Sequence, residues 1–325
     1  MPFDVPNAGT LGFHDVSTAA TDNGAAEETE TLGGASQSMK GPRQATEVKF
    51  LEIETSDGAS VGLPDGLSDG IVNRTIHLAL ATKMEDYPWT RRVPRDIFFE
   101  YVVSFANVNE ARTNWRPLFV NAIEPTLAPL LERPDATAED VVVALNRGLW
   151  FALGRADRSS GEVQPIRFVS GQTPLVYDPM STVAFGYASC TGVSILLVNA
   201  LRAAGVPARL VGTPAWQDIR EHGNHNWVEV WTPTSDGKGQ WRFFEANLPG
   251  GEAADVDKLE RDPCRRWFCN KKALGKGSGT KVYAARLDRE ASGETVYPMA
   301  WDWGNHDVLG EDRTEWYQRI CGSCS

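Results

Sequence analysis

One segment near the middle of the chain constrains the fold more than any other. From Thr191 to Ala204 the residues are apolar almost all round, which is the pattern of a helix buried on every side. Gly205-Val-Pro207 ends this helix, because Gly suits a helix C-cap and Pro cannot continue a helix. A helix of this kind needs other elements packed around it.

Three short segments rich in Val and aromatic residues follow the buried helix. We interpret them as strands, at Ala208–Thr213, His225–Trp231 and Gln240–Ala246. Asp236-Gly-Lys-Gly239 turns the last two into a hairpin. The pattern therefore predicts an α+β fold in which a central helix packs on an antiparallel sheet.

The chain upstream of this core divides into a leader and a mainly helical region. Residues 1–45 are rich in Ala, Gly, Thr, Ser and Glu and have almost no large apolar side chains after Phe13, so they are predicted to be disordered. Residues 46–160 begin with a half-buried strand, Val48–Thr55, and continue as helices. The core is assigned to residues 161–250 and a loop-rich, cysteine-containing extension to residues 251–325.

The helical signals differ in quality. Residues 71–84 and 94–107 have helical patterns, whereas the helical segment 115–131 contains Pro117, Pro125 and Pro129, which should cut it. Thr137-Ala-Glu-Asp140 is a capping box ahead of the apolar run 141–153.

Composition excludes some classes of partner. The formal net charge of −11 and the pI near 5.0 argue against nucleic-acid binding, which needs a basic face. No apolar run is long enough to span a membrane, so no membrane partner is expected. The start, Met1-Pro-Phe-Asp, shows no signal peptide.

The cysteines form an odd set. Of the five, Cys190 stands alone, and the others form two close pairs near the C-terminus, Cys264 with Cys269 and Cys321 with Cys324. An odd cysteine beside an even set is a candidate reactive thiol. Cys190 also directly precedes the buried helix, where the helix dipole and unpaired N–H groups lower a thiol pKa and stabilise an oxyanion.

The four paired cysteines admit two structural interpretations. Two disulfides would tie the tail to the segment 264–269, or four thiolates would hold a structural zinc. We expect disulfides. Together with the sequon Asn73-Arg-Thr75, they favour secretion or another oxidising compartment, although the compartment itself is not determined by the sequence.

A nucleophilic cysteine needs a base and a third group that orients the base. His225 opens one predicted strand and Glu245 lies on the next strand of the same hairpin, so the two side chains can lie side by side. Cys190 would approach them from the helix. The chain order is therefore cysteine, histidine, acid, and no metal is expected at this site.

These residues also carry a family resemblance. Ala188-Ser-Cys-Thr-Gly192 with the helix end Leu201-Arg-Ala-Ala-Gly-Val-Pro-Ala-Arg209 resembles the nucleophile segment of the transglutaminase-like superfamily. Asn224-His-Asn-Trp-Val-Glu-Val-Trp231 resembles its histidine strand, and Trp241-Arg-Phe-Phe-Glu245 its acid strand. The resemblance covers about residues 185–250 and implies a papain-like core with Cys190, His225 and Glu245 as catalytic residues.

Two features depart from the family pattern or are left open by it. The family usually has Asp where this chain has Glu245, so Asn247 is an alternative partner for the histidine. The family also supplies a Gln or Trp to the oxyanion hole, for which Trp150, Gln164 and Gln172 are candidates. Tyr187 is a further candidate, because it lies nearer to Cys190 in the sequence. Trp216, in the loop before His225, either packs in the core or lines the substrate groove.

The resemblance implies thiol-dependent acyl transfer or hydrolysis at an amide, through a thioester on Cys190. The substrate would be a peptide, a protein or a small amide, and no cofactor is required. Two rivals remain: the same residues could drive proton abstraction or elimination on a small molecule, or the domain could be a binding scaffold without activity.

Overall fold

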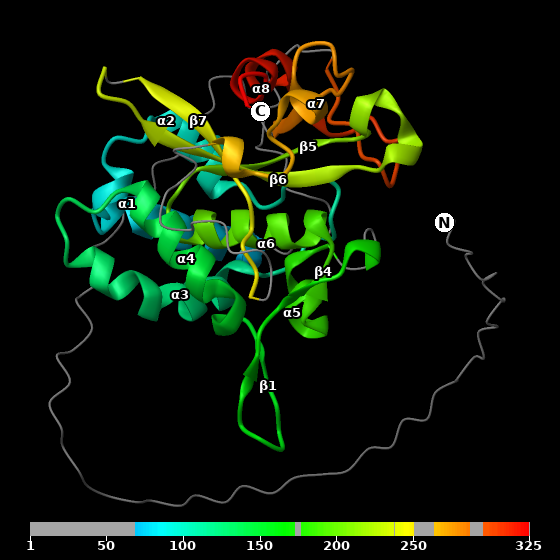
Figure 1. Ribbon diagram of the computed structural model, residues 1–325. Coiled ribbons are helices and arrows are strands. Elements are labelled where there is room, and N and C mark those ends of the chain that lie inside the picture. Colours follow the sequence, from blue (N-terminus) through cyan, green and yellow to red (C-terminus); the bar gives the residue numbers. More distant parts are fainter. Residues whose placement is uncertain (1–68, 173–176, 237, 250–262, 287–294, 325) are drawn as a thin grey trace, which may run out of the picture. The chain divides into compact units, whose positions relative to one another are not determined.

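The computed structural model of the chain describes residues 69–172, 177–236, 238–249, 263–286 and 295–324 (Figure 1). The predicted leader, residues 1–45, and the predicted strand Val48–Thr55 lie outside these ranges. The described part is a mixed helix and sheet structure, in agreement with the predicted α+β class.

The first part of the described chain is helical. Its elements are α1 (Asp69–Met84), η1 (Pro88–Thr90), α2 (Arg95–Phe98), the π-helical turn η2 (Phe99–Val103), α3 (Arg116–Leu131) and α4 (Ala138–Ala152). The helix predicted over residues 94–107 ends early, at Val103. The Glu110 carboxylate accepts hydrogen bonds from the backbone N–H groups of Asn107 and Val108, which holds the chain in a loop instead.

Helix α3 runs unbroken through two prolines, so the prediction that prolines cut this segment was wrong. Pro125 and Pro129 are four residues apart and lie on the exposed face. The hydrogen bonds lost there are on the side where water can replace them, while Phe119, Ile123 and Leu127 bury the opposite face.

The capping box is confirmed at the start of α4. The Thr137 side chain accepts from the backbone N–H of Asp140, and the Asp140 carboxylate accepts from the backbone N–H of Thr137. The apolar side of α4 then packs against the central helix.

A run of short elements leads into the central helix. They are β1 (Arg155–Ala156), β2 (Val163–Gln164), β3 (Arg167–Phe168), η3 (Ser170–Gln172), α5 (Pro179–Phe185) and β4 (Tyr187–Ala188), followed by α6 (Cys190–Ala203). Strand β4 pairs in parallel with β3. Gly186 ends α5 at φ 76°, a backbone conformation that suits glycine.

The central sheet has five antiparallel strands in the order β7-β6-β5-β8-β9. Strands β5 (Ala208–Thr213), β6 (His225–Pro233) and β7 (Gly239–Phe244) confirm the three predicted strands. The C-terminal region was expected to be loop-rich, but it adds β8 (Tyr283–Arg286), β9 (Leu309–Asp312), the turn η6 (Pro263–Arg265) and the helices α7 (Lys271–Leu274) and α8 (Thr314–Cys321). Because these strands are short, their local pattern is weak.

The sheet lies between two helical layers (Figure 1). Val228, Val230 and Phe244 face α6, which α3 and α4 cover on its other side. Trp227 and Phe243 point to the opposite face of the sheet, where α7 and α8 pack. Helix α6 therefore has neighbours all round, which explains its apolar sequence.

Candidate active site

The Cys190 thiol stands at the first residue of α6. The backbone enters the helix from β4 through Ser189, whose carbonyl accepts the first helical hydrogen bond, from the N–H of Val193. The first N–H groups of a helix have no acceptor within it and carry the positive end of its dipole. Cys190 is the one cysteine of the five outside a disulfide, and its side chain is partly exposed.

His225 is the first residue of β6 and pairs with Thr213 of β5. Its Nε2 donates to Oε1 of Glu245 at 2.8 Å. That bond leaves Nδ1 for the Cys190 thiol, with which the imidazole also interacts. The described structure therefore brings the three predicted residues together in the order thiol, imidazole, carboxylate.

The shifts in the pKa values of Cys190 and His225 favour a negatively charged thiol beside a positively charged imidazole. Burial alone would lower the pKa of His225, but hydrogen bonds to Cys190 and Glu245 and their negative charges raise that pKa to about 9. Burial alone would raise the pKa of Cys190. The hydrogen bond and charge of His225, with the backbone N–H of Asn226, lower it overall. A thiolate beside an imidazolium is the nucleophilic form of such a pair.

Glu245 follows directly after β7, one residue beyond the end of the strand. Helix α4 fixes the backbone there: Asn146 donates from Nδ2 to the carbonyl of Glu245 and accepts at Oδ1 from the N–H of Asn247. Asn146 is almost fully buried. The sequence left Glu245 and Asn247 as alternative partners of His225. Glu245 contacts the imidazole, whereas the backbone N–H of Asn247 donates to Asn146.

A second set of hydrogen bonds joins α6 to β6 beside the thiol. Asn226 donates from Nδ2 to Oγ1 of Thr191 at 2.8 Å, and its Oδ1 accepts from the Tyr297 hydroxyl at 2.7 Å. Gly212 on β5 leaves room for this side chain, because a Cβ there would collide with Asn226 Oδ1 and lie 2.6 Å from the carbonyl of His225. The backbone N–H that reaches Cys190 is thereby held in place.

Aromatic rings surround His225. Trp216 stacks on the imidazole with ring centroids 6.5 Å apart, and Trp267 and Phe268 approach it at 5.0 and 5.2 Å. Trp216 is buried, so it packs in the core and also contacts the site. Trp267 is 60% exposed, so one of the rings beside His225 is an indole open to solvent.

The other predicted site residues lie apart from these contacts. Trp150 is fully buried and donates to the carbonyl of Asn146. Gln164 is on β2, an exposed strand, and Gln172 ends η3. Tyr187 is partly buried against the core, and its ring contacts that of Phe185. No contact to the thiol or the imidazole distinguishes one of these four, within the described residues, as an oxyanion donor.

The four C-terminal cysteines form two disulfides, Cys264–Cys324 and Cys269–Cys321. They tie the tail to the segment 264–269, as the sequence predicted. A zinc ion on the same four sulfurs would require both bonds to be reduced first.

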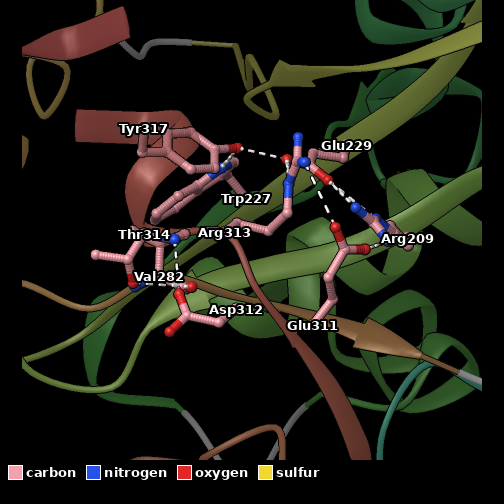
Figure 2. A network of polar contacts seen from close by, with 9 residues as sticks. All are labelled: Arg209, Trp227, Glu229, Val282, Glu311, Asp312, Arg313, Thr314 and Tyr317. Atoms are coloured by element: carbon pink, nitrogen blue, oxygen red, sulfur yellow. Dashed lines mark hydrogen bonds and ion pairs between the residues drawn. The ribbon is translucent and has the colours of Figure 1, made fainter. Parts of the chain in front are cut away.

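Strand β6 carries a second polar network, beside the site (Figure 2). Glu229 is fully buried between two guanidinium groups: Oε2 accepts from Arg209 at 2.7 Å and Oε1 from Arg313 at 3.1 Å. Tyr317 donates to the same Oε1 and accepts from Nε1 of Trp227. The network joins β5, β6 and α8, and Trp227 links it to the ring of His225.

Sequence reasoning missed several residues that touch the site. Arg266 lies 3.8 Å from Oε2 of Glu245, and Trp267 and Phe268 contact His225. Asn146 and Tyr297 act one contact further out. The position of Arg266-Trp-Phe268 between two paired cysteines was the available signal, but nothing local placed that segment against the histidine.

No helix among the residues that the structure describes is long and apolar enough to cross a membrane. A comparison with curated proteins found no match. Residues 155–246 match a family model described as the transglutaminase-like superfamily. This match confirms the resemblance drawn from the three motifs, and the stretch that contains Cys190, His225 and Glu245 is a domain of the transglutaminase-like superfamily.

Proposed function

We propose that this protein is a cysteine-dependent enzyme that attacks an amide or related acyl carbonyl through a thioester on Cys190. Members of the superfamily are often cysteine-dependent enzymes of acyl transfer or hydrolysis. The observation that carries the proposal is the chain of contacts from the Cys190 thiol through His225 to Glu245. Each residue has the chemistry of its role: nucleophile, base and orienting carboxylate.

The first half-reaction forms the thioester. The Cys190 thiolate attacks the carbonyl carbon, and the developing oxyanion faces the N–H groups at the start of α6. The C–N bond then breaks, and the His225 imidazolium gives its proton to the leaving amine. Glu245 balances the charge of the imidazolium before that transfer.

The second half-reaction releases the acyl group. Neutral His225 takes a proton from water or from an amine, which attacks the thioester carbonyl. The C–S bond breaks and returns the thiolate and imidazolium pair. Water as acceptor makes the protein a peptidase or amidase, and an amine makes it a transglutaminase.

We also propose that α6 and the strands β5, β6 and β7 form a papain-like core. The packing of α6 on β6 supports this, because it sets the nucleophile at the start of a central helix and the base at the start of a strand. The C-terminal strands and helices are then additions to that core.

A direct test is a short pulse of iodoacetamide at about pH 6.5, read by mass spectrometry of native protein. An ordinary thiol with a pKa of about 8.5 is only ~1% ionised there and barely reacts. We expect rapid single labelling at Cys190, slowed at least about tenfold in His225→Ala. A Cys190 that is inert, or equally reactive in His225→Ala, would contradict the proposal and favour a binding scaffold.

The acceptor is identified in a second assay. The protein is incubated with an unfolded, glutamine-containing protein and a fluorescent primary amine. Amine incorporation indicates a transglutaminase and chain cleavage indicates a peptidase, and both should be lost in Cys190→Ala.

A further inference from the structure

The segment 264–269, here the clasp segment, reaches the site from the C-terminal region. It lies outside the stretch that matches the family model. Between its two cysteines stand Arg266, which contacts Glu245, and Trp267 and Phe268, which contact His225. Three consecutive residues from a distant part of the chain therefore face the two residues that support the nucleophile.

The two oxygens of the Glu245 carboxylate face different partners, His225 and Arg266. Oε1 accepts from the imidazole at 2.8 Å, and Oε2 lies 3.8 Å from Nη1 of Arg266. The Arg266 side chain is only 7% exposed, and a guanidinium is buried at a cost unless a charge or hydrogen bonds offset it. With the thiolate and imidazolium, charges then alternate from Cys190 to Arg266.

The disulfides hold both ends of the clasp segment. Cys264 is bonded to Cys324, which lies just beyond α8, and Cys269 is bonded to Cys321, the last residue of α8. Inside the segment, Phe268 packs under the site, while Trp267 is mostly exposed and contributes less burial. The position of Arg266 between the two bonds thus depends on covalent links as well as on packing.

We propose that Arg266 is a positioning residue for Glu245 and that the two disulfides keep it in place, so that the reactivity of Cys190 depends on their oxidised state. This inference rests on the proposed function. Loss of the guanidinium removes the cation that lies 3.8 Å from Oε2 of Glu245, so the carboxylate is less firmly oriented toward His225. A less firmly held imidazolium stabilises the thiolate less.

The redox step needs a dithiol as reductant. For each disulfide, the dithiol supplies two electrons and two protons, the S–S bond breaks into two thiols, and the reductant closes to its own disulfide. Cys264 is exposed, whereas Cys269 and Cys321 are buried. The outer bond, Cys264–Cys324, should therefore be reduced first.

The first experiment measures the rate of Cys190 alkylation by iodoacetamide against pH. The charged and titratable groups that act on His225 among the described residues are Cys190 from α6 and Glu245 after β7. Arg266, after η6, faces Glu245, and Tyr297 faces Cys190. Arg266→Gln should lower the rate at about pH 6.5 by about tenfold and move the acid limb to higher pH. Arg266→Lys should restore most of the rate, because it keeps the charge.

Lys272→Gln is the matched control. Lys272 is an exposed cation on α7, three residues past Cys269, and its change should leave the profile as in the wild type. Circular dichroism checks that each variant is folded. Arg266→Gln with a wild-type profile, or Arg266→Lys no better than Arg266→Gln, would overturn the positioning role.

The second experiment removes the outer bond. Oxidised Cys264→Ala/Cys324→Ala, and wild type treated with a dithiol and then freed of it, should both label several-fold more slowly at Cys190. Wild-type rates in both would overturn the dependence on oxidation. If Cys190 is inert in the untreated wild type or indifferent to His225→Ala, the proposed function itself has failed, which is a different result.

Discussion

At the scale of single residues, the two nitrogens of His225 have different partners, and this fixes where its proton goes. Nε2 donates to Glu245, and the other nitrogen is left for the Cys190 thiol. In the proposed reaction the proton delivered to the leaving amine comes from the imidazolium, so activity is expected to depend on the charged form of His225.

Activity should therefore fall as the pH rises through about 9, the pKa to which the contacts of His225 raise it. The sign is the same for stability. A histidine whose folded pKa lies above its unfolded value of about 6.5 contributes stability that is complete below about pH 6.5 and lost as the pH rises to about 9. Measuring kcat/KM for an amide substrate against pH locates this fall in activity on the basic side of the profile. A limb near pH 6.5 instead would mean that Glu245 does not hold the proton on the ring.

Glu245 and Asn247 can be separated by substitution. Glu245→Gln keeps a hydrogen-bond acceptor for the imidazole but removes the negative charge, so kcat/KM should fall at least about tenfold. Asn247→Ala keeps the backbone N–H that donates to Asn146, so its activity should stay close to wild type. The reverse order of effects would assign the orienting role to Asn247.

Gly212 is a residue where a single methyl group should disturb the site. Its added Cβ would meet the Asn226 side chain and the carbonyl of His225, and the carbonyl belongs to the backbone of β6, so it cannot move without shifting the strand. Gly212→Ala should cost about 1–3 kcal/mol of unfolding free energy, measured in urea, and slow Cys190 labelling. Gly304→Ala is the control, since its Cβ would meet nothing within 4 Å. Equal stability of the two variants would show that β5 and β6 adapt freely.

At the scale of elements, β6 serves both the site and the core. Its first residues carry His225 and Asn226, while Glu229 further along holds Arg209 and Arg313 (Figure 2). Removing a fully buried carboxylate from between two guanidinium groups is costly, because Arg209 and Arg313 are then left with the partly exposed Glu311 as their shared partner.

Glu229→Gln should therefore lower the free energy of unfolding by about 3–5 kcal/mol. Glu311→Gln in the same network should cost less than about 1 kcal/mol, since the Glu311 side chain is 38% exposed. Urea unfolding of both variants compares them directly. Similar losses would mean that the two carboxylates share the charge of Arg209 equally.

At the scale of the whole molecule, the C-terminal region contributes two strands to the central sheet and contains two disulfide bonds. Strands β8 and β9 extend the sheet beyond β5, and the two disulfides span 60 and 52 residues. The bonds are nested, so either one alone closes nearly the same loop.

Removal of one disulfide should therefore cost only about 2–3 kcal/mol, whereas removal of both should cost more than twice as much. Cys264→Ala/Cys324→Ala, Cys269→Ala/Cys321→Ala and the fourfold variant test this by urea unfolding. If the losses of unfolding free energy in the two double variants add up to the loss in the fourfold variant, each bond restricts the unfolded chain independently, which would contradict this prediction. The mass of the native wild type, lower by four hydrogen atoms than the reduced chain, checks that both bonds are present.

Much of the site could be predicted because its signals are local. The apolar run of α6, the Gly-Val-Pro stop and the capping box of α4 each depend on a few neighbouring residues, and the structure confirms them. The order of Cys190, His225 and Glu245 follows from one helix and one hairpin.

The remaining features depend on contacts between residues far apart in the chain. Helix α3 keeps its prolines because tertiary packing decides which face is exposed. The helix after Pro94 gives way to a loop in which Asn107 donates to Asn199, 92 residues further along the chain. The addition of β8 and β9 to the sheet is likewise a pairing that short, weakly patterned strands do not specify. Arg266 meets Glu245 across 21 residues, in a segment that disulfides and the packing of Phe268 join to the C-terminal region. The sequence by itself determined the mixed helix and sheet class and pointed to Cys190, His225 and Glu245 as the candidate site. Only the tertiary structure decided what surrounds these residues, since long-range packing leaves no periodic mark in the local sequence.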